Sequence, residues 1–343
     1  MLSLALAILL GLISVVHGNV FTVDMAPLTV QRLDPIVFND ISPEGHVHSI
    51  FGASGFSGTG TYDELINSKC TTGNIKKDLS NYWVPSLYIE KPNGEVHYVE
   101  MYMAVYYKLI NDCCQTTPPG GPNPIVPGSI HAFPPGFKML AGGPMADGPW
   151  EGGASVNHKC MGAWIDTPAF PDRPELCTEG LRAEVSFPSC WDGVNLDSPT
   201  HNSHVSYREP GSWEGGPCPA SHPFMMPTVF FEAIYRIQDV YQPGDKLVYS
   251  MRDYTGYGFH GDFLMGWEDG IMDQLIDYCT YTEDQEYFCN AENIAGRYGG
   301  PDYSCHWDGQ GNGDYTGVLN GLPPCGSGCR PPFKNQANET LSG

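Results

Sequence analysis

Short runs in which apolar or β-branched residues alternate with polar ones recur along this chain, and turn-forming residues separate them. The clearest runs are Leu87–Ile89 and Val96–Val99, which flank a turn sequence containing Asn93-Gly94. An Asn-Gly pair between two such runs is a strong signal for a β-hairpin. The second run continues in the same alternation to Tyr107, so we expect one long strand there.

Four further runs and one helical segment complete the predicted elements. Strands are expected at Leu181–Phe187, Thr228–Ile237 and Lys246–Met251, and Val20–Phe38 is apolar and β-branched. Only Gly270–Cys279 places apolar residues at helical spacing. Because the chain contains 30 prolines and 41 glycines, much of it must be ordered loop. We therefore predict an all-β fold, an antiparallel β-sandwich with long Pro/Gly loops, disulfide bonds and few short helices.

The two ends of the chain differ in composition from its middle. Residues 1–18 form an apolar run that ends in small residues, the pattern of a secretory signal peptide cut before Asn19. A cut after Val16 would instead place His17 at the N-terminus, as copper monooxygenases with a histidine brace require. We expect the β-sandwich at 19–279, and at 280–343 a Cys/Gly-rich appendage and tail with a glycosylation acceptor at Asn338. No apolar run suits a membrane span, so we expect a secreted protein, extracellular or associated with the cell wall.

The cysteine content indicates disulfide bonds. The chain contains twelve cysteines, an even number for an exported protein, and no C-x-x-C pair that would suggest a zinc ribbon or a thioredoxin site. Cys113 and Cys114 are adjacent, so we expect them to bond to two different partners. The spacing alone does not determine the connectivity.

The charge of the chain restricts its partners. The formal net charge is -22. Nucleic acids and anionic membranes are bound by clustered Lys and Arg, so neither is an expected partner, and polyanionic polysaccharides are disfavoured for the same reason. A neutral polysaccharide or other neutral glycan fits this charge better.

One loop, Phe187–Tyr207, concentrates side chains that can carry chemistry. It contains Asp192, His201 and His204, and two prolines prevent it from forming a helix. Loops held by a rigid scaffold carry catalytic and binding groups more often than regular elements do. We expect part of the functional site to lie in this loop.

A pair of histidines suggests a second part of that site. His46 and His48 are two residues apart on a predicted strand, so both point to one face. Neutral imidazoles bind zinc or copper, and a divalent metal held by His46, His48 and His204 is one interpretation. The other is that no cofactor binds and the histidines form hydrogen bonds to loop backbones.

Several motifs, taken in order, resemble one protein family. They are Arg32-x-Asp34-Pro35-Ile36, His46-Val47-His48, Asn81-Tyr82-Trp83-x-Pro85, Phe187-Pro188-x-Cys190-Trp191-Asp192-Gly193, His201-x-x-His204-Val205, Cys218-Pro219 with His222-Pro223, and Gly258-Phe259-His260-Gly261-Asp262-Phe263 with Gly266-Trp267. From about Leu28 to Cys279, this set is similar to the secreted fungal family called domain of unknown function nineteen-ninety-six. The resemblance implies a secreted, disulfide-bonded single domain, often attached to wall-binding modules, and implies no reaction. The usual serine before the first histidine pair is replaced by Gly45.

The candidate site residues follow from these motifs. Those expected to be catalytic are polar and titratable: His46, His48, His201, His204, Asp34, Asp192 and Asp262. Imidazole titrates near working pH, and glycoside cleavage needs two carboxyl groups. Substrate contacts are expected from Trp191, Trp267, Trp83 and His260, because an indole ring can lie flat on a sugar ring.

Our hypothesis from the sequence is a secreted, monomeric, glycan-active enzyme that hydrolyses neutral cell-wall polysaccharide with acid/base catalysis from a His/Asp cluster. One alternative is a non-catalytic protein that binds carbohydrate or cell wall with the same tryptophans. Another is a metal-binding redox or hydrolytic protein with copper or zinc.

Overall fold

Antiparallel strands dominate the computed structural model of the chain, which describes residues 20–38, 45–109, 130–149, 156–209, 216–281, 289, 291–311, 313–327 and 329. The expected signal peptide, His17, the Cys113–Cys114 pair and most of the tail, with Asn338, lie outside these residues. The predicted all-β sandwich with few short helices is confirmed.

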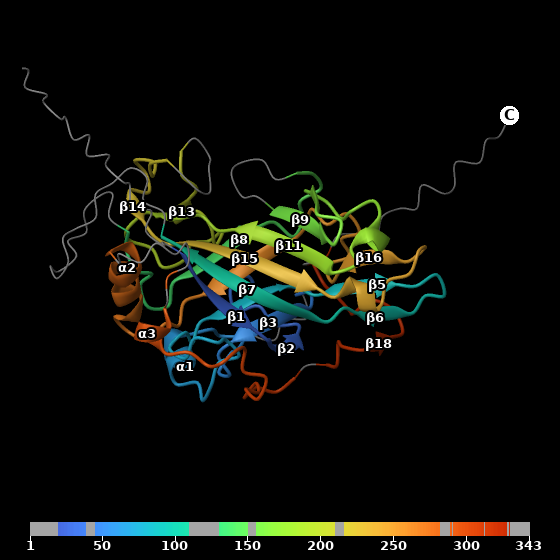
Figure 1. Ribbon diagram of the computed structural model, residues 1–343, viewed down its shortest axis with the longest axis horizontal. Coiled ribbons are helices and arrows are strands. Elements are labelled where there is room, and N and C mark those ends of the chain that lie inside the picture. The colour runs from blue at the N-terminus through green and yellow to red at the C-terminus, as the bar shows by residue number, and fades with distance from the viewer. Residues whose placement is uncertain are drawn as a thin grey trace, which may run out of the picture.

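Two sheets form the body of the protein (Figure 1). The six-stranded sheet has the order β1 (Val20–Met25), β7 (Met101–Lys108), β15 (Thr228–Tyr235), β11 (Gly180–Ser186), β9 (Val156–Met161) and β10 (Ile165–Thr167). The five-stranded sheet has the order β2 (Pro27–Gln31), β3 (His48–Gly52), β4 (Asn81–Pro85), β17 (His260–Leu264) and β8 (Lys138–Gly142).

Smaller elements surround these two sheets. A four-stranded sheet has the order β16 (Lys246–Tyr249), β5 (Leu87–Glu90), β6 (Val96–Tyr98) and β18 (Val318–Leu319), and a three-stranded one β13 (Val205–Ser206), β12 (Cys190–Trp191) and β14 (Phe224–Met225). The described helices are α1 (Tyr62–Ile66), α2 (Ile271–Tyr281) and α3 (Glu292–Ala295), with 3-10 turns at Pro174–Leu176 and Ile237–Asp239.

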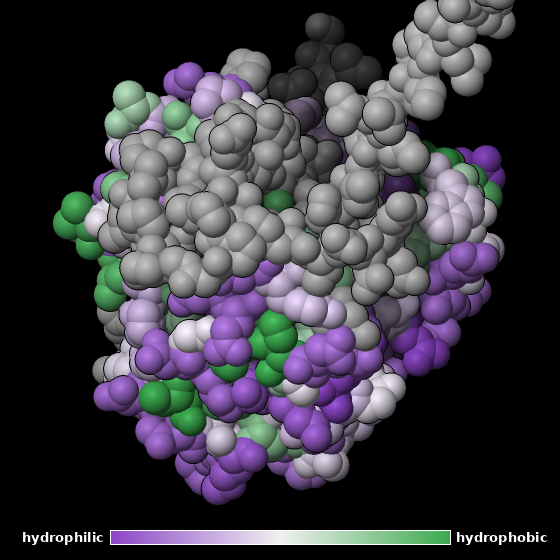
Figure 2. All heavy atoms as spheres, turned by 60° about the vertical axis from the view of Figure 1, so that its left-hand side comes forward, coloured by the Kyte–Doolittle hydropathy of each residue, from purple (hydrophilic) through white to green (hydrophobic). Residues whose placement is uncertain are grey.

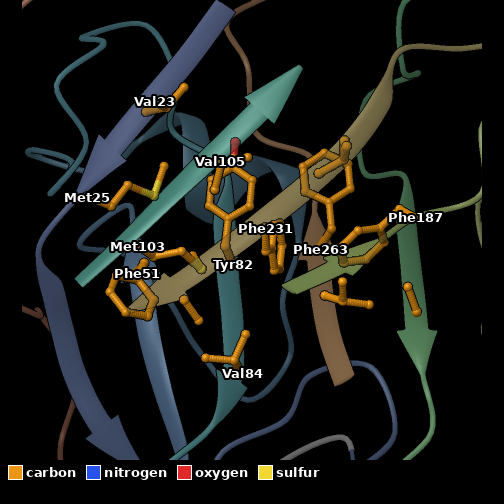
Figure 3. Packing of buried hydrophobic residues seen from close by; sticks show 14 of the residues in the cluster. Val23, Met25, Phe51, Tyr82, Val84, Met103, Val105, Phe187, Phe231 and Phe263 are labelled. Atoms are coloured by element: carbon orange, nitrogen blue, oxygen red, sulfur yellow. The ribbon is translucent and has the colours of Figure 1, made fainter. Parts of the chain in front are cut away.

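The main hydrophobic core lies between the two large sheets. Figure 3 shows Tyr82 and Phe263 of the five-stranded sheet pointing toward Phe231 of the six-stranded one. The strands approach closely at Gly261, because a Cβ there would lie 2.8 Å from the ring of Phe231 and 2.9 Å from Val185. Glycine at this position therefore allows β17 to pack directly on β15 and β11.

Helix α1 and a second group of hydrophobic side chains cover the outer face of the five-stranded sheet, opposite the main core. Ile50 and Trp83 on this face pack with Leu65 of α1 in a separate hydrophobic cluster. Helix α1 begins with a capping box, in which the backbone N–H of Glu64 donates to the Thr61 hydroxyl and the Glu64 carboxylate accepts from the Thr61 N–H. Local sequence therefore places α1, and its buried leucine holds it on the sheet.

The structure contains most of the predicted local elements. The hairpin is confirmed, since β5 pairs with β6 and the Lys91 N–H donates to the Glu95 carbonyl across the turn. The helix expected at Gly270–Cys279 is confirmed as α2, and the three later strands as β11, β15 and β16. The single long strand to Tyr107 is wrong, because β6 ends at Tyr98 and β7 begins at Met101 in a different sheet. The chain changes hydrogen-bond partners at this point while its apolar alternation continues.

Ten cysteines form five disulfide bonds in the described part of the chain. The pairs are Cys70–Cys305, Cys160–Cys177, Cys190–Cys218, Cys279–Cys289 and Cys325–Cys329. The first of them links positions 235 residues apart. Together with the pairing of β18 and β6, it attaches the C-terminal segment to the sandwich along one side (Figure 1).

The described residues on one face of the molecule are mostly polar. Figure 2 shows one face on which hydrophilic residues predominate and hydrophobic ones are scattered in small groups. This agrees with the strong net negative charge. None of the helices in the described part of the chain has the length and apolar character that a membrane crossing needs.

A buried histidine in β9 is expected to make folding sensitive to acid. His158 is fully buried against Tyr249, Phe170 and Phe259, and burial lowers its pKa from 6.5 to about 3. Below pH 6.5 the unfolded chain binds a proton that the folded chain does not bind until about pH 3. The free energy of unfolding should therefore fall with decreasing pH in this window, by up to about 1.4 kcal/mol per pH unit from this group.

We expect His158→Gln to reduce this pH dependence, because glutamine carries no titratable group and keeps a polar partner for the Tyr249 hydroxyl. The measurement is denaturant unfolding of both proteins at several pH values in the window. Burial also raises the pKa of Asp78 to about 6. This carboxyl group changes the pH dependence of the unfolding free energy with the opposite sign, and it does so equally in both proteins. Its contribution therefore cancels when the two slopes are subtracted. Equal slopes for the two proteins would contradict the assignment.

Candidate functional site

The outer face of the five-stranded sheet collects the polar residues of the sequence motifs. Directly opposed residues of an antiparallel pair point to the same face, and Ile50, Trp83 and Asp262 are opposed on β3, β4 and β17. His48 and His260 lie two residues along their strands from this row, so they share its face. Strand β4 lies between β3 and β17 in this sheet, and this strand order brings residues from distant parts of the chain together.

Three histidines form a compact buried cluster on this face. His46, His48 and His260 are 3%, 0% and 1% exposed. The Nε2 atoms of His46 and His260 are 3.2 Å apart, and the ring of His48 packs against both. One ring nitrogen from each residue lies within 4.8 Å of the others, so the three form a candidate metal-ligand set.

Hydrogen bonds determine the protonation of two of these rings. Nδ1 of His48 lies 3.1 Å from the Leu33 carbonyl oxygen, and Nδ1 of His260 lies 2.8 Å from that of Gly258. A carbonyl only accepts, so both Nδ1 atoms carry the proton. Burial lowers the pKa of His48 well below its ordinary value and that of His260 to about 4. Near neutral pH both rings are therefore uncharged, with a lone pair on Nε2.

Two buried aspartates lie on the same side of the sheet. Asp34 accepts hydrogen bonds from the N–H groups of Ile36 and Val37 through Oδ1, at 3.0 and 3.1 Å. Burial raises the pKa of Asp34, although these hydrogen bonds act in the opposite direction. Burial also raises the pKa of Asp262 well above its usual range, and the charge of Asp34 raises it further. Neither carboxyl oxygen of Asp262 has a hydrogen-bond partner among the described residues.

The loop that the sequence singled out lies along the edge of this sheet. The N–H groups of Lys138 and Leu140 on β8 donate to the carbonyls of Leu196 and His201, at 2.9 and 3.0 Å. Nε2 of His204 lies 2.8 Å from the Lys138 carbonyl oxygen. The loop therefore extends the sheet beyond β8 and brings two of its motif histidines to the site.

Electrostatics link this loop to the aspartates. His201 contacts Asp197 through Nδ1 at 2.9 Å, and its charge lowers the pKa of Asp34. The Lys138 amino group donates to the Pro35 carbonyl at 3.2 Å. Burial lowers the pKa of Lys138, while the charges of Asp197 and Asp34 act against it. Lys138 belongs to none of the sequence motifs, and its strand β8 was not among the predicted elements, so the sequence analysis gave no signal for it.

A cleft of about 340 Å³ opens beside the site. Its lining includes Leu140, Gly142, Asn202 and Arg208. Leu140 is directly opposed to Asp262 in the pairing of β8 with β17. The cleft therefore runs along β8, the strand next to β17, and neither Asp262 nor Asp34 is among its lining residues.

The structure places the other loop residues outside the histidine cluster. Oδ1 of Asp192 accepts hydrogen bonds from the N–H groups of Val194 and Asn195, at 2.8 and 2.9 Å, and so the side chain caps its own turn. His204 has both ring nitrogens engaged, Nε2 with Lys138 and Nδ1 with the Ser198 hydroxyl at 3.0 Å. The third histidine beside His46 and His48 is accordingly His260, where the sequence analysis expected His204.

The tryptophans divide into buried and partly exposed side chains. Trp83 and Trp267 are both 0% exposed, so neither lines an open cleft, in contrast to the expectation from the sequence. Trp267 packs in the main core and donates from Nε1 to the Tyr107 hydroxyl at 2.9 Å. Trp191 is partly exposed and lines a second cleft of about 340 Å³ with Phe224 and other residues.

Comparison with known proteins identifies the chain at the level of a family. No curated protein and no solved structure matches it. The family described as Domain of unknown function (DUF1996) matches residues 34–267, a span that contains every residue of the histidine and aspartate clusters described above. Because this match covers more than half of the chain, the protein belongs to the DUF1996 family.

Proposed function

We propose that the protein is a secreted enzyme that hydrolyses neutral polysaccharide, with Asp262 and Asp34 as its carboxyl pair. Glycoside hydrolysis commonly uses two carboxyl groups, one on each side of the scissile bond. The neighbouring His201 and Lys138 would orient the substrate and tune the charge of the pair.

The single observation that carries this proposal is the state of Asp262. Its carboxyl group is completely buried, and neither oxygen has a hydrogen-bond partner among the described residues. Leaving a buried polar group unsatisfied costs about 1–3 kcal/mol, and native structures rarely tolerate it without a functional reason. A second carboxyl group, Asp34, lies close enough to influence it electrostatically.

Charge supports a neutral substrate. The chain has a formal net charge of -22, which disfavours the binding of a polyanionic glycan. Secretion is supported by the apolar N-terminal run and by the five disulfide bonds, which form and persist in oxidising compartments.

The test is the release of new reducing ends from a panel of neutral fungal and plant polysaccharides at mildly acidic pH, with and without a chelator. We expect release from at least one substrate, and we expect it to persist with chelator because the proposed acid and base are carboxyl groups. Absence of release from every substrate would overturn the proposal. If the chelator abolishes release, a bound metal and not the carboxyl pair carries out the chemistry.

A non-catalytic glycan-binding protein is the second candidate, and the environment of Trp191 favours it. This side chain is partly exposed in a cleft with Phe224 and His131, an aromatic surface suited to a sugar ring. Retention of the folded protein on a polysaccharide without cleavage, together with weaker retention of Trp191→Ala, would support this candidate.

A further inference from the structure

The histidine cluster provides a second chemical capacity that carboxyl-based hydrolysis does not use. From the geometry of this cluster, we infer that His46, His48 and His260 bind one divalent zinc or copper ion. The inference is independent of the proposed function, because it concerns binding and requires no substrate.

The spacing of the ring nitrogens suits a metal. Two nitrogen ligands of a tetrahedral zinc ion lie about 3.3 Å apart, given Zn–N bonds of about 2.0–2.1 Å. The Nε2 atoms of His46 and His260 are 3.2 Å apart. The third ring contributes a nitrogen within 4.8 Å of the other two, so a small rotation of buried rings would complete a three-nitrogen site.

Two of the three rings already have the tautomer of a metal ligand. Histidines that bind metals commonly donate their other N–H to a carboxylate or to a backbone carbonyl, which orients the ring. His48 does this with Leu33 and His260 with Gly258. Both rings therefore direct an Nε2 lone pair away from the carbonyl that holds them.

The environment of one ring nitrogen of His48 is an independent observation. Nε2 of His48 is completely buried, and it has no hydrogen-bond partner among the residues that the structure describes. A buried acceptor without a partner is costly unless something occupies its lone pair. A cation held jointly with His46 and His260 would satisfy it.

The donor set selects the class of ion. Three imidazole nitrogens without a thiolate suit zinc, copper and related transition metals, whereas calcium and magnesium prefer oxygen ligands. Zinc and copper share this coordination chemistry, and the experiment below has an arm for each.

The test uses tag-free protein stripped of metal and titrated calorimetrically with zinc and, separately, with copper near neutral pH. We expect saturable binding of one ion per chain. His48→Gln and His260→Gln should each weaken binding by at least about 100-fold, since removal of a ligand should exceed the 10–100-fold effect of losing an outer partner. His204→Gln is the matched control and should bind like the wild-type protein, because both of its ring nitrogens have other partners.

A spectroscopic measurement covers the case in which the ligand variants do not fold. Copper bound to the wild-type protein should show electron paramagnetic resonance couplings from imidazole nitrogens. The absence of such couplings, the absence of one-to-one binding, or wild-type affinity in both folded ligand variants would overturn the inference. A protein that binds the ion and cleaves no polysaccharide would refute the proposed function and leave this site standing.

Discussion

Replacing Asp262 by asparagine is expected to lower the rate of polysaccharide cleavage by at least about 100-fold, because proton transfer by a positioned group typically contributes 10²–10⁴ in rate. The side chain of asparagine has nearly the same shape, so the packing around β17 should persist. The measurement is the initial rate of reducing-end release on the substrate found in the panel. Thermal unfolding of the same preparation shows whether the fold is intact.

A control variant carries the same chemical change at a site far from the proposed chemistry. Asp302→Asn is suitable, because Asp302 is an aspartate near the surface that caps its own turn through the Ser304 N–H and hydroxyl. This variant should cleave at the wild-type rate. Wild-type activity in a folded Asp262→Asn protein would remove this carboxyl group from the mechanism.

The second large effect is expected on stability, in Trp267→Ala. Large-to-small substitutions of a buried tryptophan cost about 3–5 kcal/mol, because transfer energy is lost and a cavity remains. Trp267 is fully buried, packs edge-on against Phe21 and Tyr107, and donates a hydrogen bond to the Tyr107 hydroxyl. The variant removes this donor as well. Denaturant unfolding measures the loss as a lower midpoint.

Trp191→Ala serves as the comparison, because this ring is partly exposed and leaves a smaller cavity. We expect it to lose much less stability than Trp267→Ala. The opposite result, a stable Trp267→Ala protein with weakened polysaccharide retention, would return Trp267 to the substrate-contact role that was expected from the sequence.

The helix and the hairpin were predictable because each depends on residues close together in the chain. The Asn93-Gly94 turn and its flanking alternation predict the hairpin, because the turn geometry and the period of two act within a few residues. The apolar spacing after Gly270 predicts α2 for the same reason. The division of the expected long strand at Val99 and Glu100 was not predictable, because both sheets bury one face and alternation continues across the change of partner.

The candidate site was likewise predictable only in part. The two rings of His46 and His48 converge as alternation indicated, but the strand predicted for both is wrong at His46, because β3 begins at His48. The addition of His260 depends on β4 pairing with both β3 and β17, a choice made between strands far apart in sequence. The burial of Trp83 and Trp267 depends in the same way on which face of each strand the rest of the molecule covers.

The sequence by itself determined the all-β class, the use of cysteines in disulfide bonds, the family, and the motifs from which a site is built. These properties depend on composition and on interactions between near neighbours along the chain. Only the tertiary structure decided that His260 joins His46 and His48, and that Asp262 is buried with both carboxyl oxygens unpartnered among the described residues. The physical reason is that strand order and the packing of one sheet on another are selected by the total burial of the chain, which no local pattern encodes.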